Sequence, residues 1–334
     1  MMDASGYDIF VNNRIIKFLD ALERREPVAR LLFEKMDWSP GDGLTAEFSI
    51  GALSAVAGTV GERQRIPAVN PAQSGTLLKS QLQYGQAFEI TKRMKLGNKW
   101  QSADYYAEQT AMGIIDGLDY DMTHQIFSQA ENATYSHRTE GTINISCIDA
   151  LAPASTAHTV TGTGTTQYSN RLNGTTGLVL STDNFVAAKQ LPNQNAVDEY
   201  GTPIRCAYRQ LLIAQNEDMV RKGRQIFGSP KEPEVFENAM NIYNDGQHQL
   251  FVLTHGDTDT DLSYESALRY RWVLKSGDPR LRQLNAYQIA QEAGIQLESV
   301  DENNLAARVV GDLFAAYACP GWQDKVYSTA TTSP

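Results

Sequence analysis

The sequence predicts an α+β fold in which an extended segment leads into one long helix, a smaller region of alternating helices and strands follows, and an apolar strand closes the chain. Three observations support this fold class. Apolar and polar residues partly alternate over residues 82–91, as in a strand with one solvated face. Small and aliphatic residues recur at steps of three and four over residues 99–131, and residues 308–318 are mostly apolar.

The composition is that of a globular protein. Of its 334 residues, 42% are hydrophobic and 20% are charged. A net charge of −10 argues against a sequence-specific DNA reader, which usually carries a basic face, although loose contact with DNA through local basic spots stays open. The chain starts without a basic region followed by an apolar run, and its longest weakly polar stretch is short. We therefore expect neither a signal peptide nor a membrane segment.

Residues 7–37 are interpreted as an N-terminal arm that contains helix. Apolar residues recur at helical spacing and are interrupted at Pro27; they are Ile15, Ile16, Leu19, Leu22, Val28, Leu31, Leu32 and Met36. An arm of this kind either packs on its own domain or lies on a neighbouring molecule.

Residues 45–96 carry the clearest β character. Residues 61–75 between the candidate strands are polar and contain two prolines, which indicates a long hairpin with a flexible tip. A two-stranded ribbon is marginal in water, so such a hairpin favours packing against another molecule.

The segment 99–131 predicts one helix, which at 1.5 Å per residue is roughly 45 Å long. Its apolar line requires it to lie along a sheet or to form the backbone of a domain. Asp116, Asp119 and Asp121 spread around such a helix, so we interpret them as a solvated face and not as paired catalytic carboxylates.

Residues 152–178 are rich in Thr, Gly, Ser and Ala and predict a mobile surface loop. Alternating signals follow from Ser181 onward. We expect helices at 183–189 and 217–227 and strands at 208–214, 250–253 and 270–274, before the core strand at 308–318.

The sequence lacks the common catalytic and metal-binding signatures. The chain contains no phosphate-binding loop, H-E-x-x-H, G-x-S-x-G or C-x-x-C motif, and its five histidines lack metal-ligand spacing. The acidic run after Asp257 fails as an EF-hand, because the required Gly and Glu positions hold Leu262 and Leu268. We therefore expect no catalytic residue, no cofactor and no metal.

Two other residue types are interpreted as structural. Three widely spaced cysteines, an odd number, are expected to be small buried thiols in a reducing cytoplasm; they are Cys147, Cys206 and Cys319. Trp100, Trp272 and Trp322 are expected to anchor the core or an interface.

The order of these segments resembles the Hong-Kong-97-type major capsid protein of tailed phages. Three stretches carry the likeness: Tyr84 to Thr91 entering the long helix, Leu211 to Ala214 with the following helix to Pro230, and Val309 to Asp312 with Tyr317 to Trp322. The likeness covers nearly the whole chain, but it rests on layout and short degenerate motifs.

The resemblance implies a division of the chain. Residues 1–45 would form the N-terminal arm, residues 46–98 the extended loop, residues 99–150 with 265–334 the peripheral domain with its spine helix, and residues 151–264 the axial domain. It also implies a non-enzymatic structural protein of the virion, assembled in the host cytoplasm. Its copies would form the hexamers and pentamers of an icosahedral shell around double-stranded DNA, bound without sequence specificity.

Further partners implied by the resemblance are portal and scaffold proteins and a decoration or cement protein, with no membrane. We expect contacts between subunits at seven residues: Phe10, Ile15, Ile16 and Leu19 on the arm, Ile66 and Val69 on the hairpin, and Lys79 beside it. No motif assigns Lys79 a partner or an acid for crosslinking between subunits, so noncovalent contacts are expected.

Three alternatives stay open. The first is an encapsulin-like nanocompartment shell, which shares the fold but encloses a cargo enzyme. The second is a cytoplasmic α/β enzyme using residues 181–275, which would require a convergent polar pocket. The third is a tail or baseplate protein, favoured by the Thr- and Gly-rich loop alone.

Overall fold

The structure, a computed structural model, describes residues 28–39, 43–50, 75–91, 100–160, 165–174, 176–198, 201–229, 241, 243–258, 268–298 and 305–331. The helices are α3 (Trp100–Thr123), α4 (Thr182–Gln190), α5 (Pro192–Asn195) and α6 (Glu217–Gly228). The strands are β1 (Glu34–Met36), β2 (Thr45–Ile50), β3 (Gly75–Ser80), β4 (Leu82–Thr91), β5 (Thr134–His137), β6 (Gly141–Asn144), β7 (Tyr208–Ala214), β8 (Gln249–Leu253), β9 (Trp272–Ser276), β10 (Ala286–Glu298), β11 (Leu305–Ala318) and β12 (Lys325–Ser328). Short 3₁₀ turns lie at Ala29–Leu32, Leu268–Tyr270 and Pro279–Leu284, and a π-helical turn lies at His124–Ser128.

The longest strands form the first sheet, in the order β1-β10-β11-β4. β11 pairs antiparallel with both β10 and β4, and β1 adds a short parallel edge at the start of β10. Two register shifts between Ile289 and Gly294 each place one extra residue in β10 opposite β11. These bulges bend the sheet and increase its local twist.

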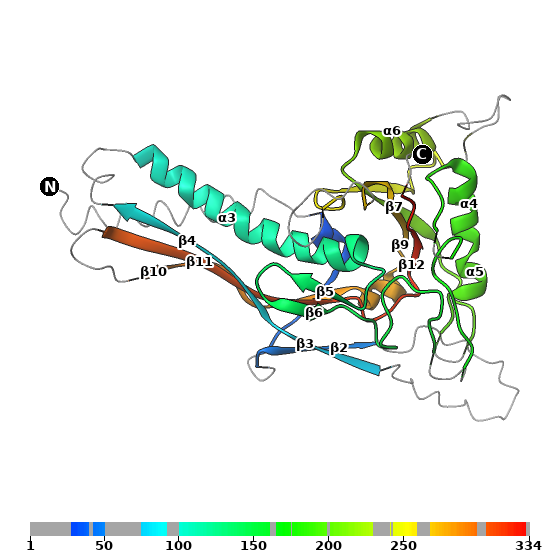
Figure 1. The fold of residues 1–334 in the computed structure, drawn as a ribbon, viewed down its shortest axis with the longest axis horizontal. Helices are drawn as coiled ribbons and strands as arrows, with labels where there is room; N and C mark the ends of the chain where they lie inside the picture. The colour runs from blue at the N-terminus through cyan, green and yellow to red at the C-terminus, as the bar shows by residue number, and fades with distance from the viewer. Residues whose placement is uncertain are drawn as a thin grey trace, which may run out of the picture.

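Helix α3 lies along this sheet and extends with it to one side of the molecule (Figure 1). The predicted apolar line is buried, and Ile114, Leu118 and Met122 share a hydrophobic core with Tyr84 of β4 and Leu313 of β11. The 24 residues of α3 span about 36 Å at 1.5 Å each. The predicted long helix is thus confirmed, with its last turn wound as a π-helix.

The second sheet has the order β12-β9-β7-β8, and its inner strand β7 packs on both faces. Leu212 and Ala214 of β7 face the core beneath α3, whereas Leu211 and Ile213 face the core that α4 and α6 cover. Burial on both faces accounts for the unbroken apolar run that predicted this strand. The predicted β7, β8 and β9 are all confirmed, the last beginning two residues later than expected.

Helices α4 and α6 begin where the sequence predicts, because each has a polar cap. The Ser181 hydroxyl accepts from the Asn184 amide, and the Asn216 side chain accepts from the Asp218 and Met219 amides. These caps satisfy backbone N–H groups that have no partner within the helix. Glu217 and Asp218 lie in the first turn of α6, where negative charge is favourable.

Two antiparallel ribbons complete the fold (Figure 1). β2 pairs with β3 from Thr45 opposite Ser80 to Ile50 opposite Gly75, and β5 pairs with β6. The predicted strands at the base of the hairpin are therefore present. Residues 51–74, which include nearly all of the predicted tip, lie outside the described residues.

The helical pattern predicted over residues 28–36 is wrong. Only Ala29–Leu32 form a 3₁₀ turn, and Met36 belongs to strand β1. The Glu34 amide donates to the Asn285 carbonyl at 2.8 Å, so pairing with β10 overrides the local helical spacing. Ala29, Leu32 and Phe33 are buried in the chain's own core, which means that the end of the arm packs on its own domain.

The prediction of a mobile surface loop over residues 152–178 is wrong for most of its described part. Ala154, His158, Asn170 and Leu172 are buried. The Asn170 side chain donates to the Pro153 carbonyl at 2.8 Å and accepts from the Ser155 amide at 3.0 Å, which ties two parts of the segment together. Composition alone did not show these long-range contacts.

Two predicted structural roles are confirmed where the structure describes them. Trp272 and Trp322 are buried in the core, and Cys147 and Cys319 are buried free thiols, whereas Cys206 is half-buried. Burial raises the pKa of the Cys319 thiol to about 11, so this thiol stays protonated near neutral pH.

Among the helices of the described chain, none combines the length and apolar character needed to cross a membrane.

The packing of α3 on the first sheet predicts a strong effect of one core substitution. Leu118→Ala should lower the free energy of unfolding by about 2–5 kcal/mol, because it removes a fully buried side chain and leaves a cavity. The control is Leu44→Ala, whose side chain is 67% exposed and which should change stability by less than about 0.5 kcal/mol. Equal losses for both variants in denaturant titrations would contradict this packing.

Candidate functional site

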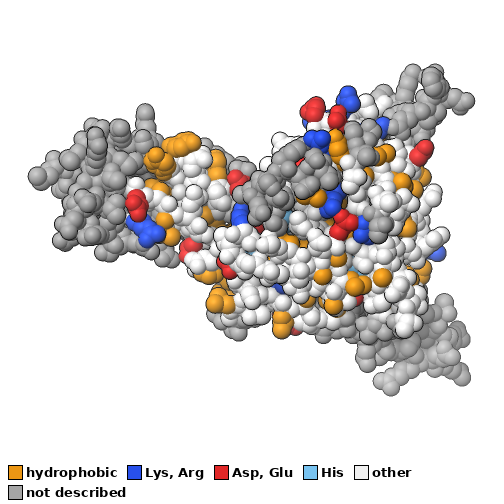
Figure 2. All heavy atoms as spheres, viewed as in Figure 1, with side chains coloured by type: hydrophobic (Ala, Val, Ile, Leu, Met, Phe, Trp, Pro, Cys, Tyr) orange, Lys and Arg blue, Asp and Glu red, His pale blue; other side chains and the backbone are white. Residues whose placement is uncertain are grey.

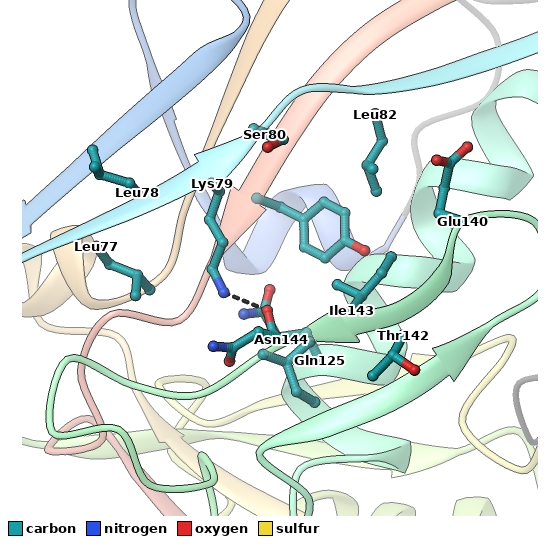
Figure 3. Close-up of a pocket in the computed structure, with 13 residues that line it drawn as sticks. Leu77, Leu78, Lys79, Ser80, Leu82, Gln125, Glu140, Thr142, Ile143 and Asn144 are labelled. Carbon is teal, nitrogen blue, oxygen red and sulfur yellow. Dashed lines mark hydrogen bonds between the residues drawn. The ribbon is translucent and has the colours of Figure 1, made fainter.

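Of the seven residues predicted to contact other subunits, the structure describes Lys79. The other six are Phe10, Ile15, Ile16, Leu19, Ile66 and Val69, and they lie outside the described residues. Lys79 projects from β3 into a pocket between the β2–β3 ribbon and the β5–β6 ribbon (Figure 3).

The pocket has a volume of about 360 Å³ and a mixed lining. Leu77, Leu82 and Ile143 supply apolar surface, and Gln125 and Tyr317 lie among the polar residues around it. Sequence reasoning missed Gln125, because nothing in its local pattern distinguishes it from other polar positions of the helix.

The Lys79 amine donates a hydrogen bond to the Asn144 carbonyl and so links the two ribbons within one chain (Figure 3). Burial lowers the pKa of this amine from its ordinary value. The sequence-based assignment of Lys79 to a contact between subunits stays a prediction, since its observed partner belongs to the same chain.

The contact between Lys79 and Asn144 is one polar link between elements of the fold. A second polar cluster, centred on Asp121, fixes α3 to the strands beside it. The fully buried Asp121 carboxylate accepts from the Tyr84 hydroxyl at 2.7 Å and from His137 Nε2 at 2.9 Å. His137 Nδ1 accepts from the amides of Thr139 and Glu140, so the ring carries its proton on Nε2. Burial and the nearby carboxylate raise the pKa of Tyr84 well above its ordinary value, which keeps the phenol protonated and donating.

Asp119 plays a related part on the next face of the helix. It is buried, and its Oδ1 accepts from the Ala29 amide at 2.8 Å, which holds the first described turn of the chain. The prediction that Asp119 and Asp121 form a solvated face is therefore wrong. The helix is packed on more than one side, and the single apolar line in the sequence does not reveal the second packing surface.

A third polar cluster lies where the two sheets meet and is defined by Lys275, Asn285, Asp324 and Lys325. Asp324 Oδ1 accepts from Lys325 Nζ at 2.6 Å, and its Oδ2 lies 3.5 Å from Lys275 Nζ. Asn285 Oδ1 accepts from Lys325 Nζ at 2.6 Å, and Asn285 Nδ2 donates to Asp324 Oδ2 at 2.5 Å. The cluster joins β9 and β12 of the second sheet to the residue that precedes β10 of the first.

The pKa values of the two lysines in this cluster are shifted in opposite directions. Burial lowers the pKa of the Lys275 amine. Burial also acts to lower the pKa of Lys325, but the adjacent Asp324 carboxylate outweighs it and the net pKa is raised. The resting cluster therefore contains a Lys325–Asp324 ion pair.

Exposed apolar side chains form the remaining candidate surfaces. Leu78 on β3 is 64% exposed and Tyr105 on α3 is 58% exposed; Leu31, Leu44 and Tyr106 are also exposed. Figure 2 shows hydrophobic side chains gathered over the outer part of α3 and at the lower edge of the molecule. Aromatic side chains such as Tyr105 and Tyr106 are of a type that is enriched at surfaces that contact other proteins.

The described residues include acidic side chains that pair within the fold. No group of three or more His, Cys, Asp or Glu side chains among them is placed to hold a metal ion. The buried acidic residues at Asp119 and Asp121 are engaged in hydrogen bonds between elements of the fold, which gives them a structural role.

No protein-family model and no curated protein matches the chain. Solved structures do. The capsid structure of the cyanophage P-SCSP1u is 11% identical, with 90% of this chain and 87% of that chain covered and a TM-score of 0.51. A structure from Gordonia phage Cozz is 14% identical, covering 90% and 85% at a TM-score of 0.50. A virus-like particle from Pyrococcus furiosus is 8% identical, covering 95% and 98% at a TM-score of 0.50.

The likeness extends over most of both chains in each comparison, so it concerns the whole fold and not one motif. At such low identity it establishes the fold. The predicted α+β fold of phage capsid proteins is thereby confirmed.

The Asp121 cluster generates a second prediction. Asp121→Ala should destabilise the folded chain by about 2–4 kcal/mol, because it leaves the buried Tyr84 hydroxyl and His137 Nε2–H without their acceptor. Asp121→Asn, which keeps the shape and one acceptor oxygen, should lose less. Denaturant unfolding of the three proteins measures this, and a smaller loss for the alanine variant than for the asparagine variant would contradict the assigned bonds.

Proposed function

We propose that this chain is a major capsid protein of a tailed double-stranded DNA phage, whose copies assemble into the hexamers and pentamers of an icosahedral shell around the genome. The observation that carries the proposal is the fold shared with a phage capsid structure over 90% of this chain and 87% of the other. Fold alone does not define function, so the physical character of the chain has to fit as well.

The shape of the subunit supports assembly. The long strands of the first sheet and helix α3 extend away from the compact part that holds the second sheet (Figure 1). An elongated subunit presents long edges to its neighbours. A standard interface buries roughly 1,600 Å² in total, and many modest contacts repeated around a closed shell give a stable whole.

The β2–β3 ribbon supports assembly for an energetic reason. One face of the ribbon carries Phe48 and Leu77 toward the chain's own core, whereas Leu78 is exposed on the other. A neighbouring subunit that covered Leu78 would bury apolar surface, worth about 25 cal/mol per Å². We extend this proposal to the arm residues Phe10, Ile15, Ile16 and Leu19, to Ile66 and Val69, and to the division into arm, extended loop, peripheral domain and axial domain.

The acidic charge fits a container for DNA. A net charge of −10 keeps the shell wall from gripping its cargo tightly, because each neutralised phosphate would add salt-dependent affinity. Portal, scaffold and decoration proteins are the further partners of the proposed function, which includes no chemical reaction.

The direct test is negative-stain electron microscopy of the purified chain, expressed with and without its neighbouring genes. We expect round shells tens of nanometres across with clusters of six and five subunits. A uniform monomer or dimer under every condition would overturn the proposal.

A second candidate is a shell that encloses a cargo protein in place of a genome, as in an encapsulin-like nanocompartment. The likeness to a structure described as a virus-like particle from Pyrococcus furiosus, which covers 98% of that chain, supports a shell other than a phage head. Nuclease-protected DNA inside particles isolated from the native host would support the phage capsid. A protein cargo without DNA would support the nanocompartment.

Leu78→Glu should block regular shell formation while leaving the subunit folded. The substitution puts a charge on an exposed apolar position, so it should change the free energy of unfolding by less than about 0.5 kcal/mol. Gln225→Glu on the exposed side of α6 is the matched control for added negative charge, and it should still form shells. Normal shells from the Leu78 variant would remove the ribbon from the proposed interface.

Deleting residues 1–26 should also leave a folded subunit, because the proposed role of the arm is to pack on neighbouring subunits. We expect this variant to sediment as free subunits or small oligomers, since the arm residues proposed to contact neighbours are gone. Circular dichroism checks the fold and electron microscopy checks assembly. Regular shells from the shortened chain would show that the arm is dispensable.

A further inference from the structure

The third polar cluster brings an amine, a carboxamide and a carboxylate together in the interior of the protein. The side chains of Asn285, Asp324 and Lys325 are all fully buried. Each of the three contacts the other two at hydrogen-bond distance, between 2.5 and 2.6 Å. Lys325 and Asn285 are 40 residues apart in sequence, so the fold itself creates this arrangement.

The lysine amine lies close to the carbonyl carbon of Asn285. Nζ is 2.6 Å from Oδ1, and a C=O bond is about 1.23 Å long, so Nζ lies within about 3.8 Å of Cγ. Reacting atoms in productive ground-state complexes are about 3–3.5 Å apart. For attack, the Asn285 carboxamide must rotate about its Cβ–Cγ bond so that the face of Cγ turns toward the amine.

The cluster contains more basic groups than acidic groups. Lys275 and Lys325 both pair with Asp324, at 3.5 and 2.6 Å, so two buried amines face one carboxylate. An uncompensated buried charge is costly. Loss of one ammonium charge would leave Lys275 and Asp324 as a single balanced pair.

We propose that Lys325 and Asn285 join in an autocatalytic isopeptide bond within the folded chain, with Asp324 as the proton carrier. Asp324 takes a proton from Lys325 along their hydrogen bond, and the free amine attacks Asn285 Cγ. The new Nζ–Cγ bond forms, Asp324 delivers its proton to Nδ2, and the Cγ–Nδ2 bond breaks. The departing ammonia takes the excess proton of Nζ, so one ammonium ion leaves and no oxidant or reductant is needed.

The bond would connect the two sheets covalently. Lys325 opens β12 of the second sheet, and Asn285 directly precedes β10 of the first. Force applied to the long strands would then reach the second sheet through an amide bond as well as through side-chain packing. The inference does not depend on the proposed shell function, because it concerns a single chain.

Intact-mass spectrometry of the denatured full chain tests the proposal. We expect a mass lower than that of the sequence by one ammonia molecule, in freshly purified protein or after prolonged incubation in the folded state. Trypsin should leave peptide 283–308 attached to peptide 309–334, because it does not cleave after a lysine whose amine is in an amide. A wild-type chain that keeps its full mass after incubation overturns the proposal, whatever its assembly state.

Matched variants locate the reaction. Lys325→Met, Asn285→Ala and Asp324→Asn should each keep their full calculated mass. Lys189→Met removes a different partly buried lysine, and Asn241→Ala removes a different buried asparagine; both should still lose one ammonia. A mass loss that persists in Lys325→Met, or that maps to other residues, also overturns the proposal. If a cluster variant fails to fold, the linked peptides of the wild-type chain decide.

Discussion

Burial of helix α3 against the first sheet is the interaction on which the rest of the structure depends. The strands β4, β11 and β10 are long and would form a thin sheet with two wet faces if no helix covered one of them. The far end of the same helix reaches the core beneath the second sheet, where Ile126 and Phe127 pack with Leu212 and Val273. One element therefore provides the shared core of both sheets, and its length sets how far the subunit extends.

Buried polar groups then determine how the other elements are arranged around this core. Asp119 holds the first described turn, Asp121 holds β4 and β5, and Asp324 holds the junction between the sheets. Apolar burial is non-directional, whereas each of these carboxylates accepts hydrogen bonds at fixed positions. Buried charges contribute little net stability, but a misplaced element would leave one of them without partners, at a cost of several kcal/mol. We infer that these clusters select one arrangement among many that bury similar apolar area.

The sequence predicted elements whose signal is local. The spacing of α3, the apolar run of β7 and the start of α6 were sufficient to locate them. Strand β10 was missed, because its many Ala, Gln and Glu residues favour helix and only pairing with β11 makes it extended. For the same reason the buried roles of Asp121 and Asn285 have no sequence signal, since their partners lie on other strands. Of the predicted contact residues, Lys79 could be placed in the structure, and its partner within the same chain could not be foreseen.

The two bulges of β10 have a consequence for which side of the sheet its residues face. Successive residues of a strand face opposite sides, so one extra residue exchanges the two faces for the remainder of the strand. Between Ile289 and Gly294 the strand contains two such extra residues. The second exchange reverses the first. Beyond the bend, alternate positions of β10 therefore face the same sides of the sheet as they would without any bulge. The sheet can thus curve at this point while the outer half of the strand keeps the same positions on each face. Losing either extra residue alone would exchange the two faces of that half.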